Sequence, residues 1–328
     1  MNSLFIGNFG SNKSINGQVI KTKELFDLIK SHESVLRVDT SKLSTLTIFF
    51  NTNKIKVIYI CLGQNGLLWF LPLIFFLNLF IFKAEFKFFL VGGWFLNFIN
   101  KYTSHNFFFF NSSIYVESST LSHSLNKLGL NSFVFPNFRN ESILHPKFLC
   151  FRDKKKYKFC FVSRIIESKG VFVIIDLIKE LEYHNIIATV DFFGPIDQSI
   201  KDKFNRNLTD TIRYMGNLDD SRKVIDTISN YDFTLLPTYY DGECIPGVLV
   251  ESMMAGTPVI VTDFKFINEI VSNNFNGYIY KSDNFIPSVC NVLGKINDSI
   301  YFNMSKNSIE YVINNQSIFV AKNILKFD

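Results

Sequence analysis

The stretch that decides the fold reads Asp241-Gly-Glu-Cys-Ile-Pro-Gly-Val-Leu-Val-Glu-Ser-Met-Met-Ala-Gly-Thr-Pro-Val259. An apolar, strand-like run over residues 231–237 precedes it, and a second such run over residues 258–262 follows its central apolar segment. A helix between two continuous apolar strands is typical of a parallel sheet covered by helices. The sequence therefore predicts an α/β protein.

Pro246 suits the first turn of this helix, because a proline has no N–H that would need a helical partner there. Glu243 is then expected in the preceding loop and Glu251 inside the helix. An anion such as a diphosphate would be stabilised at the helix start by the dipole and by unpaired amides. Those amides are expected to be the N–H groups of Gly247, Val248 and Leu249.

Glu243 and Glu251 have two interpretations. Two carboxylates at this spacing fit solvated acids on an ordinary core helix. Their position after a predicted strand favours a ligand site, because ligands of open α/β sheets bind outside the carboxyl ends of the strands. Carboxylates there can accept hydrogen bonds from sugar hydroxyls.

The second half of the chain alternates strand and helix patterns, as a Rossmann-like domain does. The predicted strands are 157–163, 187–193, 212–215, 232–237 and 258–262. The predicted helices are 169–183, 197–206, 219–229, 247–255 and 265–273.

The first half shows a weaker version of the same pattern. Its predicted strands are 3–6, 35–38, 56–61, 86–91, 113–117 and 133–135, and its predicted helices are 17–31, 67–80 and 119–129. An irregular and then highly charged stretch over 136–158 predicts the boundary between two domains. We place the domains at 1–150 and 151–328, with the last helix expected to pack back on the first domain.

A second cluster, Phe161-Val-Ser-Arg-Ile-Ile-Glu-Ser-Lys-Gly170, carries two cations. Arg164 lies just past a predicted strand, and Lys169 lies at a helix start. A solvated turn would also account for them. Together they can neutralise a diphosphate leaving group, for which arginine offers paired donors and lysine a mobile charge.

These clusters resemble glycosyltransferase family 4, the group 1 retaining transferases of GT-B fold. The family pattern has an Arg, four residues and Lys-Gly, here Arg164 and Lys169-Gly170, and then a Glu, seven residues and a Glu, here Glu243 and Glu251. Gly194 and Gly216 resemble the family's glycines after the next two strands. Glu269 and Gly277 resemble its closing segment.

The first domain resembles the family more loosely. Gly17 lies where members have a glycine-bearing loop that reaches the donor phosphates, and Val91-Gly-Gly-Trp94 and Phe135-Pro-Asn-Phe138 resemble landmarks of polysaccharide-building members. Ser163 replaces a family glycine, which is tolerated unless the backbone needs positive φ. His105 and His123 lie off the position of the first-domain His that many members carry, so no catalytic His is assigned.

The resemblance implies two Rossmann-like domains that face each other across a donor cleft. Arg164 and Lys169 would stabilise the departing diphosphate, Glu243 would hold the donor sugar, and Glu251 would hold the ribose. Backbone amides of Gly247 and Val248 would bind phosphate or sugar. No cofactor and no metal is expected, and Asp219-Asp220 is interpreted as a helix cap.

The expected reaction transfers a sugar from a nucleotide sugar, UDP favoured, to a carbohydrate acceptor, with retention of anomeric configuration. A lipid-linked acceptor in surface polysaccharide synthesis (lipopolysaccharide or capsule) is favoured. Three other classes stay open: a GT-B sugar-nucleotide epimerase, a non-catalytic sugar-nucleotide-binding protein, and an integral membrane protein anchored by residues 67–82.

Charge is unevenly distributed along the 328 residues. Residues 1–150 hold 14 Lys and Arg against 7 Asp and Glu, and the rest holds 20 against 22, which gives net charges of +7 and −2. A basic first half predicts peripheral contact with an anionic inner membrane surface, although solubility alone also explains it. No nucleic-acid partner is expected.

Residues 67–82 carry no charge, but the stretch is shorter than a spanning helix needs, which is about 17–25 residues. A buried or interfacial helix is favoured over a span. The five cysteines show neither zinc spacing nor a disulfide framework, and the start lacks a basic leader, so a cytoplasmic protein is expected.

Overall fold

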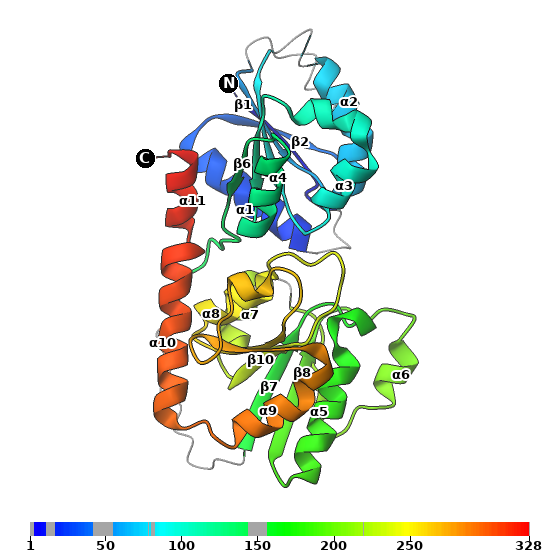
Figure 1. Cartoon of the computed structure of the whole chain (residues 1–328), viewed down its shortest axis with the longest axis vertical. Coiled ribbons are helices and arrows are strands. Elements are labelled where there is room, and N and C mark those ends of the chain that lie inside the picture. Colours follow the sequence, from blue (N-terminus) through cyan, green and yellow to red (C-terminus); the bar gives the residue numbers. More distant parts are fainter. Residues whose placement is uncertain are drawn as a thin grey trace. The chain divides into compact units, whose positions relative to one another are not determined.

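A computed structural model describes residues 3–10, 17–41, 55–77, 79, 83–143, 156–218 and 220–327 (Figure 1). Its internal contacts divide the chain into two units. Unit 1 comprises Met1–Asn137, Asp241–Cys244 and Ile318–Asp328, and unit 2 comprises Phe138–Tyr240 and Ile245–Ser317. The domain boundary expected at residue 150 falls outside the described residues and stays a prediction.

Unit 1 is built on a parallel six-stranded sheet of order β2-β1-β3-β4-β5-β6. Its strands are β1 (Ser3–Gly7), β2 (Val35–Asp39), β3 (Val57–Cys61), β4 (Glu85–Leu90), β5 (Ser113–Val116) and β6 (Ser132–Val134). All six predicted strands are present, each with ends within one residue of the expectation.

The helices of unit 1 include three that the sequence predicted. These are α1 (Gly17–His32), α2 (Gln64–Leu77) and α4 (Ser119–Lys127). Helix α3 (Phe95–Lys101) and the 3₁₀ helix η3 (Thr103–Phe109) were not predicted. Unit 1 also includes the terminal helix α11 (Ile318–Leu325), and Phe327, two residues beyond it, stacks on His32 with ring centroids 4.8 Å apart.

A buried lysine joins α1 to the end of the sheet of unit 1. Lys21 Nζ donates to the carbonyl of Pro136 at 2.6 Å and to Asn137 Oδ1 at 3.2 Å, and it lies 3.5 Å from Glu117 Oε1. A buried ammonium needs such partners, because desolvation of an unpaired charge is costly. The segment after β6 is therefore held against α1.

Unit 2 is built on a second parallel sheet, of order β12-β11-β10-β7-β8-β9. Its strands are β7 (Lys156–Val162), β8 (Ile187–Phe193), β9 (Ile212–Tyr214), β10 (Phe233–Leu236), β11 (Val259–Thr262) and β12 (Gly277–Tyr280). Strands β10 and β11 are buried along their whole length, as continuous apolar runs predict. Five of the six strands were predicted, and β12 was not.

Helices cover both faces of this sheet (Figure 1). Helices α5 (Val171–Tyr183) and α9 (Phe285–Leu293) pack together, and α8 (Gly247–Met254) packs with α7 (Ser221–Ile228) and α10 (Asp298–Asn315). Helices α5, α7 and α8 match predicted helices to within two residues. Helices α9 and α10 were missed.

Two predicted helices of unit 2 are wrong. The helix expected over 197–206 is only α6 (Lys201–Asn205), because Asp197 Oδ1 accepts a hydrogen bond from the Ser199 N–H and forms a turn instead. The helix expected over 265–273 is a single 3₁₀ turn, η5 (Ile267–Glu269). Lys265 has a left-handed φ of 51°, which an α-helix excludes.

Helix α2 is apolar on its exposed side as well as on its buried side. Leu67 and Leu71 are buried, whereas Trp69, Leu73 and Phe76 are 78%, 47% and 55% exposed. In the part of the chain that the structure describes, no helix has both the length and the apolar character needed to cross a bilayer. Residues 78 and 80–82, which end the predicted apolar stretch, lie outside the described residues.

Candidate functional site

The strand order of unit 2 creates a switch point between β7 and β10. From β7 the chain proceeds to β8 and β9 on one side, and then returns to β10, β11 and β12 on the other. In open α/β sheets the loops after two such strands diverge and leave a crevice at their carboxyl ends. Arg164 and Lys169 follow β7, and residues 237–246 follow β10.

Arg164 and Lys169 are brought together around one aromatic ring. The Arg164 Cζ and the Lys169 Nζ each lie 5.2 Å from the centroid of the Tyr240 ring. Arg164 is exposed and Lys169 is buried. The electron-rich face of a tyrosine attracts cations, so Tyr240 is a partner that both side chains share.

The loop that carries Tyr240 is tied to the loop that carries Lys169. The Tyr239 N–H donates to the Ser168 carbonyl at 2.8 Å, and Thr238 Oγ1 donates to the same carbonyl at 3.3 Å. The Thr262 Oγ1 at the end of β11 donates to the Thr238 carbonyl at 2.6 Å. The carboxyl ends of β7, β10 and β11 are therefore joined.

Gly170 permits this close approach. It has a φ of 80°, and a Cβ at this position would lie 2.2 Å from the Pro237 carbonyl oxygen. Only glycine combines a left-handed φ with the absence of a side chain at no steric cost. The glycine of the Lys169-Gly170 motif is thus needed for the packing of the loop after β10 beside Lys169.

Gly194 and Gly216 are also brought together, at the ends of β8 and β9. The Gly194 N–H donates to the Gly216 carbonyl at 2.9 Å. Gly194 has a φ of 132°, and a Cβ there would lie 2.0 Å from the Ser163 carbonyl oxygen. Ser163 itself is not among the described residues with left-handed φ, which explains why a serine fits this position.

Asp197 is a carboxylate near Arg164 that sequence reasoning missed. Hydrogen bonds from the side chain and the N–H of Ser199 hold the pKa of Asp197 below its usual range, and the charge of Arg164 adds to this effect. The neighbouring backbone joins the loops after β7 and β8, because the Asp197 N–H donates to the Ile165 carbonyl at 3.1 Å.

The start of helix α8 differs from the expectation in two ways. Pro246 is the residue before the first turn, with φ −62° and ψ 127°, and the helix begins at Gly247. The Leu249 N–H donates to the Pro246 carbonyl at 3.1 Å, so the prediction of a free amide at Leu249 is wrong. A hydrogen bond between residues three apart is common in the first turn of a helix, and here it uses the Leu249 amide.

Glu251 forms a buried ion pair with Arg139, a residue that sequence reasoning missed. The Arg139 Nε donates to Glu251 Oε1 at 2.8 Å, and Nη1 donates to the Phe138 carbonyl at 3.0 Å. A Cβ on Gly247 would lie 1.9 Å from Arg139 Nη2, so this glycine makes room for the guanidinium. The ribose-binding role predicted for Glu251 stays a prediction, and the structure adds this partner.

The remaining predicted residues belong to unit 1. Gly17 is the first residue of α1, and residues 11–16 before it lie outside the described part of the chain. Glu243 is buried in segment 241–244, which packs in unit 1, where a Cβ on Gly92 would lie 3.2 Å from the Gly242 carbonyl oxygen. The Val91-Gly-Gly-Trp94 landmark is thus in contact with the loop of Glu243.

Polar residues considered for other roles are also located. The predicted cap is confirmed for Asp220, whose Oδ1 accepts from the Lys223 N–H at 2.8 Å at the start of α7, whereas Asp219 lies outside the described residues. His123 is exposed on α4, and the side chain of His105 is not described. Among the described residues, no group of three His, Cys, Asp or Glu side chains could hold a metal ion.

Comparison with known proteins finds similarity to glycosyltransferases over part of the chain. Residues 150–286 match the model of the glycosyl transferases group 1. An uncharacterised glycosyltransferase of Methanocaldococcus jannaschii is 29% identical over 147 residues, which is 44% of this chain and 37% of the relative. The predicted resemblance to group 1 glycosyltransferases is therefore confirmed, and it lies mainly in unit 2.

Two further comparisons extend over more of the chain. The UDP-Gal:alpha-D-GlcNAc-diphosphoundecaprenol alpha-1,3-galactosyltransferase of Escherichia coli is 25% identical over 212 residues, 62% of this chain and 52% of that protein. The crystal structure of Anabaena HepE in complex with UDP has a TM-score of 0.70 at 14% identity, over 99% of both chains. The predicted GT-B fold, with two Rossmann-like domains, is confirmed. The chain spans only 37% to 52% of the length of these curated relatives.

Gly194 and Gly216, at the ends of β8 and β9, are expected to respond differently to substitution. We expect Gly194→Ala to reduce the free energy of unfolding by more than about 3 kcal/mol. The φ of Gly194 lies in a region that only glycine occupies, and an added Cβ would clash with the backbone. Gly216→Ala is the matched control. It has a φ of 88° with no atom within 4 Å of the added Cβ, so about 1–2 kcal/mol is expected. Urea denaturation measures both, and equal costs would contradict the role assigned to Gly194.

The ion pair of Arg139 and Glu251 predicts strong coupling. Each of Arg139→Ala and Glu251→Ala should reduce the free energy of unfolding by about 3–5 kcal/mol, because each removes one half of a buried ion pair. The double variant should lose clearly less than the sum of the two. Additive losses in a double-mutant cycle, measured by urea denaturation, would show that the pair does not act as a unit.

Proposed function

We propose that this protein is a retaining glycosyltransferase that transfers a sugar from a nucleotide sugar, with UDP as the favoured nucleotide, to a carbohydrate acceptor. One observation carries the proposal: Arg164 and Lys169 converge at the switch point of unit 2, in the region that matches group 1 glycosyltransferases. Glycosyltransferase relatives and the UDP-bound fold neighbour support it.

In this proposal the two cations act on the leaving group. Negative charge grows on the diphosphate as its bond to the sugar breaks, and fixed positive groups at that place lower the energy of the transition state. Tyr240 and the hydrogen bonds of residues 238 and 239 hold the cations in position before the donor binds. This preorganisation avoids a cost of ordering during the reaction.

The remaining roles follow the family resemblance. Glu243 holds hydroxyls of the donor sugar, and Glu251 holds the ribose. The amides of Gly247 and Val248 bind phosphate or sugar, Gly17 approaches the donor phosphates, and Gly194 and Gly216 shape the phosphate-facing loops. The acceptor attacks on the face that the nucleotide leaves, so the anomeric configuration is retained, and the donor phosphate helps to accept the proton. The reaction requires no metal and no cofactor.

Substitution of the two cations tests this function. Arg164→Ala and Lys169→Ala should each reduce turnover about 10²–10³-fold, as removal of one electrostatic group does in comparable sites. Arg206→Ala, on the exposed end of α6, is the control and should leave turnover unchanged. Nucleotide release from a panel of UDP-sugars and GDP-sugars, with and without saccharide acceptors, is the measurement. Near-normal turnover in both test variants would refute the assignment, and donor conversion without any acceptor would favour an epimerase.

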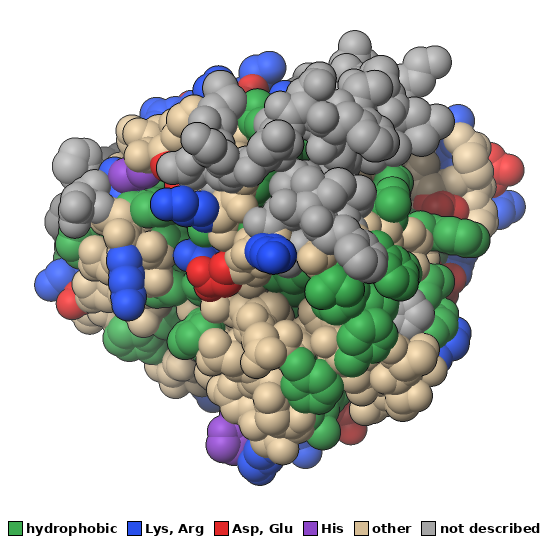
Figure 2. Space-filling view, turned by 90° about the horizontal axis from the view of Figure 1, so that it is seen from above, with side chains coloured by type: hydrophobic (Ala, Val, Ile, Leu, Met, Phe, Trp, Pro, Cys, Tyr) green, Lys and Arg blue, Asp and Glu red, His purple; other side chains and the backbone are tan. Residues whose placement is uncertain are grey.

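We also propose that the acceptor is lipid-linked, that the reaction belongs to surface polysaccharide synthesis, and that the protein contacts the cytoplasmic membrane surface peripherally. The Escherichia coli relative, whose name specifies a diphosphoundecaprenol acceptor, supports this. The exposed stripe of Trp69, Leu73 and Phe76 on α2 supports it as well, because these side chains are spaced to lie on one helix face. Figure 2 shows that hydrophobic side chains and Lys and Arg side chains both occur on the face seen from above.

Lys83 complements this stripe, because it is exposed, follows α2 in the chain and can contact anionic lipid headgroups. Lys87 lies on β4, with its Nζ 5.7 Å from the centroid of the Tyr59 ring, and is not part of this surface. An apolar helix face with nearby basic residues is typical of a segment that lies in the membrane interface.

A sedimentation experiment tests the contact with membranes. Trp69→Ser combined with Phe76→Ser should reduce binding to vesicles that contain phosphatidylglycerol by at least about tenfold, because both side chains would otherwise bury apolar area in the lipid. Phe319→Ser on α11, where the side chain is 67% exposed, is the matched control. Equal vesicle binding by the α2 variant and the control would exclude α2 as the contact surface.

A further inference from the structure

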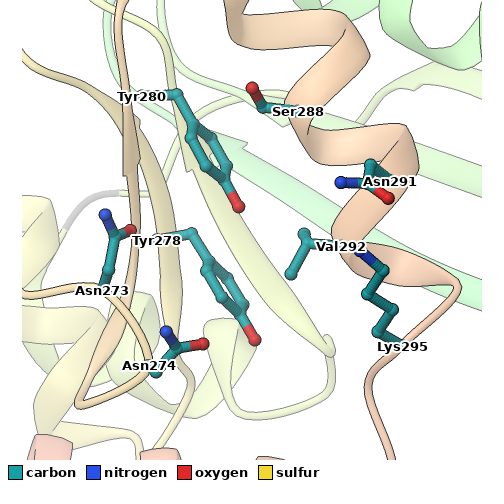
Figure 3. A pocket seen from close by; sticks show the side chains of 8 residues that line it. All are labelled: Asn273, Asn274, Tyr278, Tyr280, Ser288, Asn291, Val292 and Lys295. Carbon is teal, nitrogen blue, oxygen red and sulfur yellow. The ribbon is translucent and has the colours of Figure 1, made fainter.

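Unit 2 holds a small pocket at the β12 edge of its sheet, away from the switch point between β7 and β10. It lies between the edge strand β12 and helix α9, and its volume is about 250 Å³ (Figure 3). Strand β12 is separated from β10 by β11 in the sheet order. The volume is below the range of about 300–1,000 Å³ that is usual for drug-sized ligands, so the pocket suits one small unit rather than a nucleotide.

Two tyrosines form one wall of the pocket. Tyr278 and Tyr280 lie two residues apart on β12, so both side chains point to the same face of the sheet. Their rings are parallel to within 5°, with centroids 6.1 Å apart, and Figure 3 shows both directed into the pocket towards α9. The faces of aromatic rings carry partial negative charge, which attracts the C–H groups on the flat side of a sugar ring.

The opposite wall supplies polar groups that the protein itself does not use. Ser288 and Asn291 on α9 and Lys295 after it face the pocket in Figure 3. Within the described residues, the side chains of these three and the hydroxyls of Tyr278 and Tyr280 have no hydrogen-bond partner or ion-pair partner. Hydroxyl, amide and ammonium groups at the edge of a concave aromatic surface are available for a ligand rich in hydroxyls.

The tyrosine hydroxyls remain protonated at neutral pH. Burial, together with the nearby Tyr278, raises the pKa of Tyr280 to about 12, and burial also raises the pKa of Tyr278 above its usual value. Each hydroxyl can therefore both donate and accept a hydrogen bond. The segment that precedes β12 is tied to the strand, because the Ile279 N–H donates to Asn273 Oδ1 at 2.8 Å.

We propose that this pocket is a saccharide subsite that takes one pyranose unit of the acceptor chain, remote from the sugar that receives the transfer. The ring packs on the half-buried Tyr280, which the buried Tyr278 supports from behind, and its hydroxyls bind Ser288, Asn291 and Lys295. The identity of the ligand as part of the acceptor rests on the proposed function. The pocket as a sugar site rests on its own side chains.

Ligand-detected NMR with the full chain tests the subsite. Saturation transfer from protein to methyl glucoside, methyl N-acetylglucosaminide and methyl glucuronide should be observed for at least one of the three. Tyr280→Ala should weaken that binding at least about tenfold, because it removes half of the aromatic wall. Tyr183→Ala is the matched control, because this tyrosine is 79% exposed on α5 and does not line the pocket.

A second variant guards against a folding defect at β12. Asn291→Ala changes an exposed side chain on α9, so the variant should fold as the parent does, and it should also weaken the glycoside signal. Absence of saturation transfer with all three glycosides would overturn the proposal. So would a signal that both variants retain at full strength.

The same samples separate this inference from the proposed function. Thermal stabilisation by UDP-sugars and nucleotide release test the transferase, whereas glycoside binding tests the pocket. If Tyr280→Ala abolishes glycoside binding but the parent protein neither binds nor consumes any donor, the sugar site stands and the transferase function is refuted. Donor turnover without glycoside binding would refute the pocket alone. With both intact, Tyr280→Ala should raise the KM for a long saccharide acceptor and leave the KM for the donor unchanged.

Discussion

The close approach of the Pro237 carbonyl to Gly170 is the contact on which the site of unit 2 depends. A Cβ at position 170 would lie 2.2 Å from that oxygen, so any other residue would push the loops after β7 and β10 apart. The hydrogen bonds from residues 238 and 239 to Ser168 exist only at this separation. They place Tyr240 beside Arg164 and Lys169, and so the absence of one side chain determines where two charges lie.

Much of the fold could be predicted, because its strands carry their signal locally. Strands such as β10 and β11 are uninterrupted apolar runs, and buried parallel strands require such runs whatever their neighbours are. The positions of Arg164 and Lys169 could be predicted for the same reason, since residues that directly follow a parallel strand lie at the carboxyl edge of the sheet. The cap at Asp220 follows from the chemistry of one residue and its own helix.

The features that were missed depend on partners far away in the sequence. Arg139 contacts Glu251 across 112 positions, and nothing in the neighbourhood of either residue specifies the other. Helix α10 was missed because its apolar residues do not recur with a clear helical period. Its buried side is determined by packing on α8, which the local sequence does not reveal. The pocket beside β12 could not be predicted either, because its walls come from β12 and α9, which only the folded chain brings together.

The pair of Arg139 and Glu251 changes how the start of helix α8 can meet a phosphate. A guanidinium at the positive end of a helix dipole is unfavourable by itself, and the carboxylate 2.8 Å from Nε offsets it. Because the pair is neutral overall, the helix start contributes only the partial charge of its amides, about half an elementary charge. One of the three expected amides, that of Leu249, is already bonded. A diphosphate bound at this edge, as proposed, would therefore be neutralised mainly by Arg164 and Lys169. Loss of Arg139 would leave Glu251 as a net negative charge near that diphosphate, which would repel it.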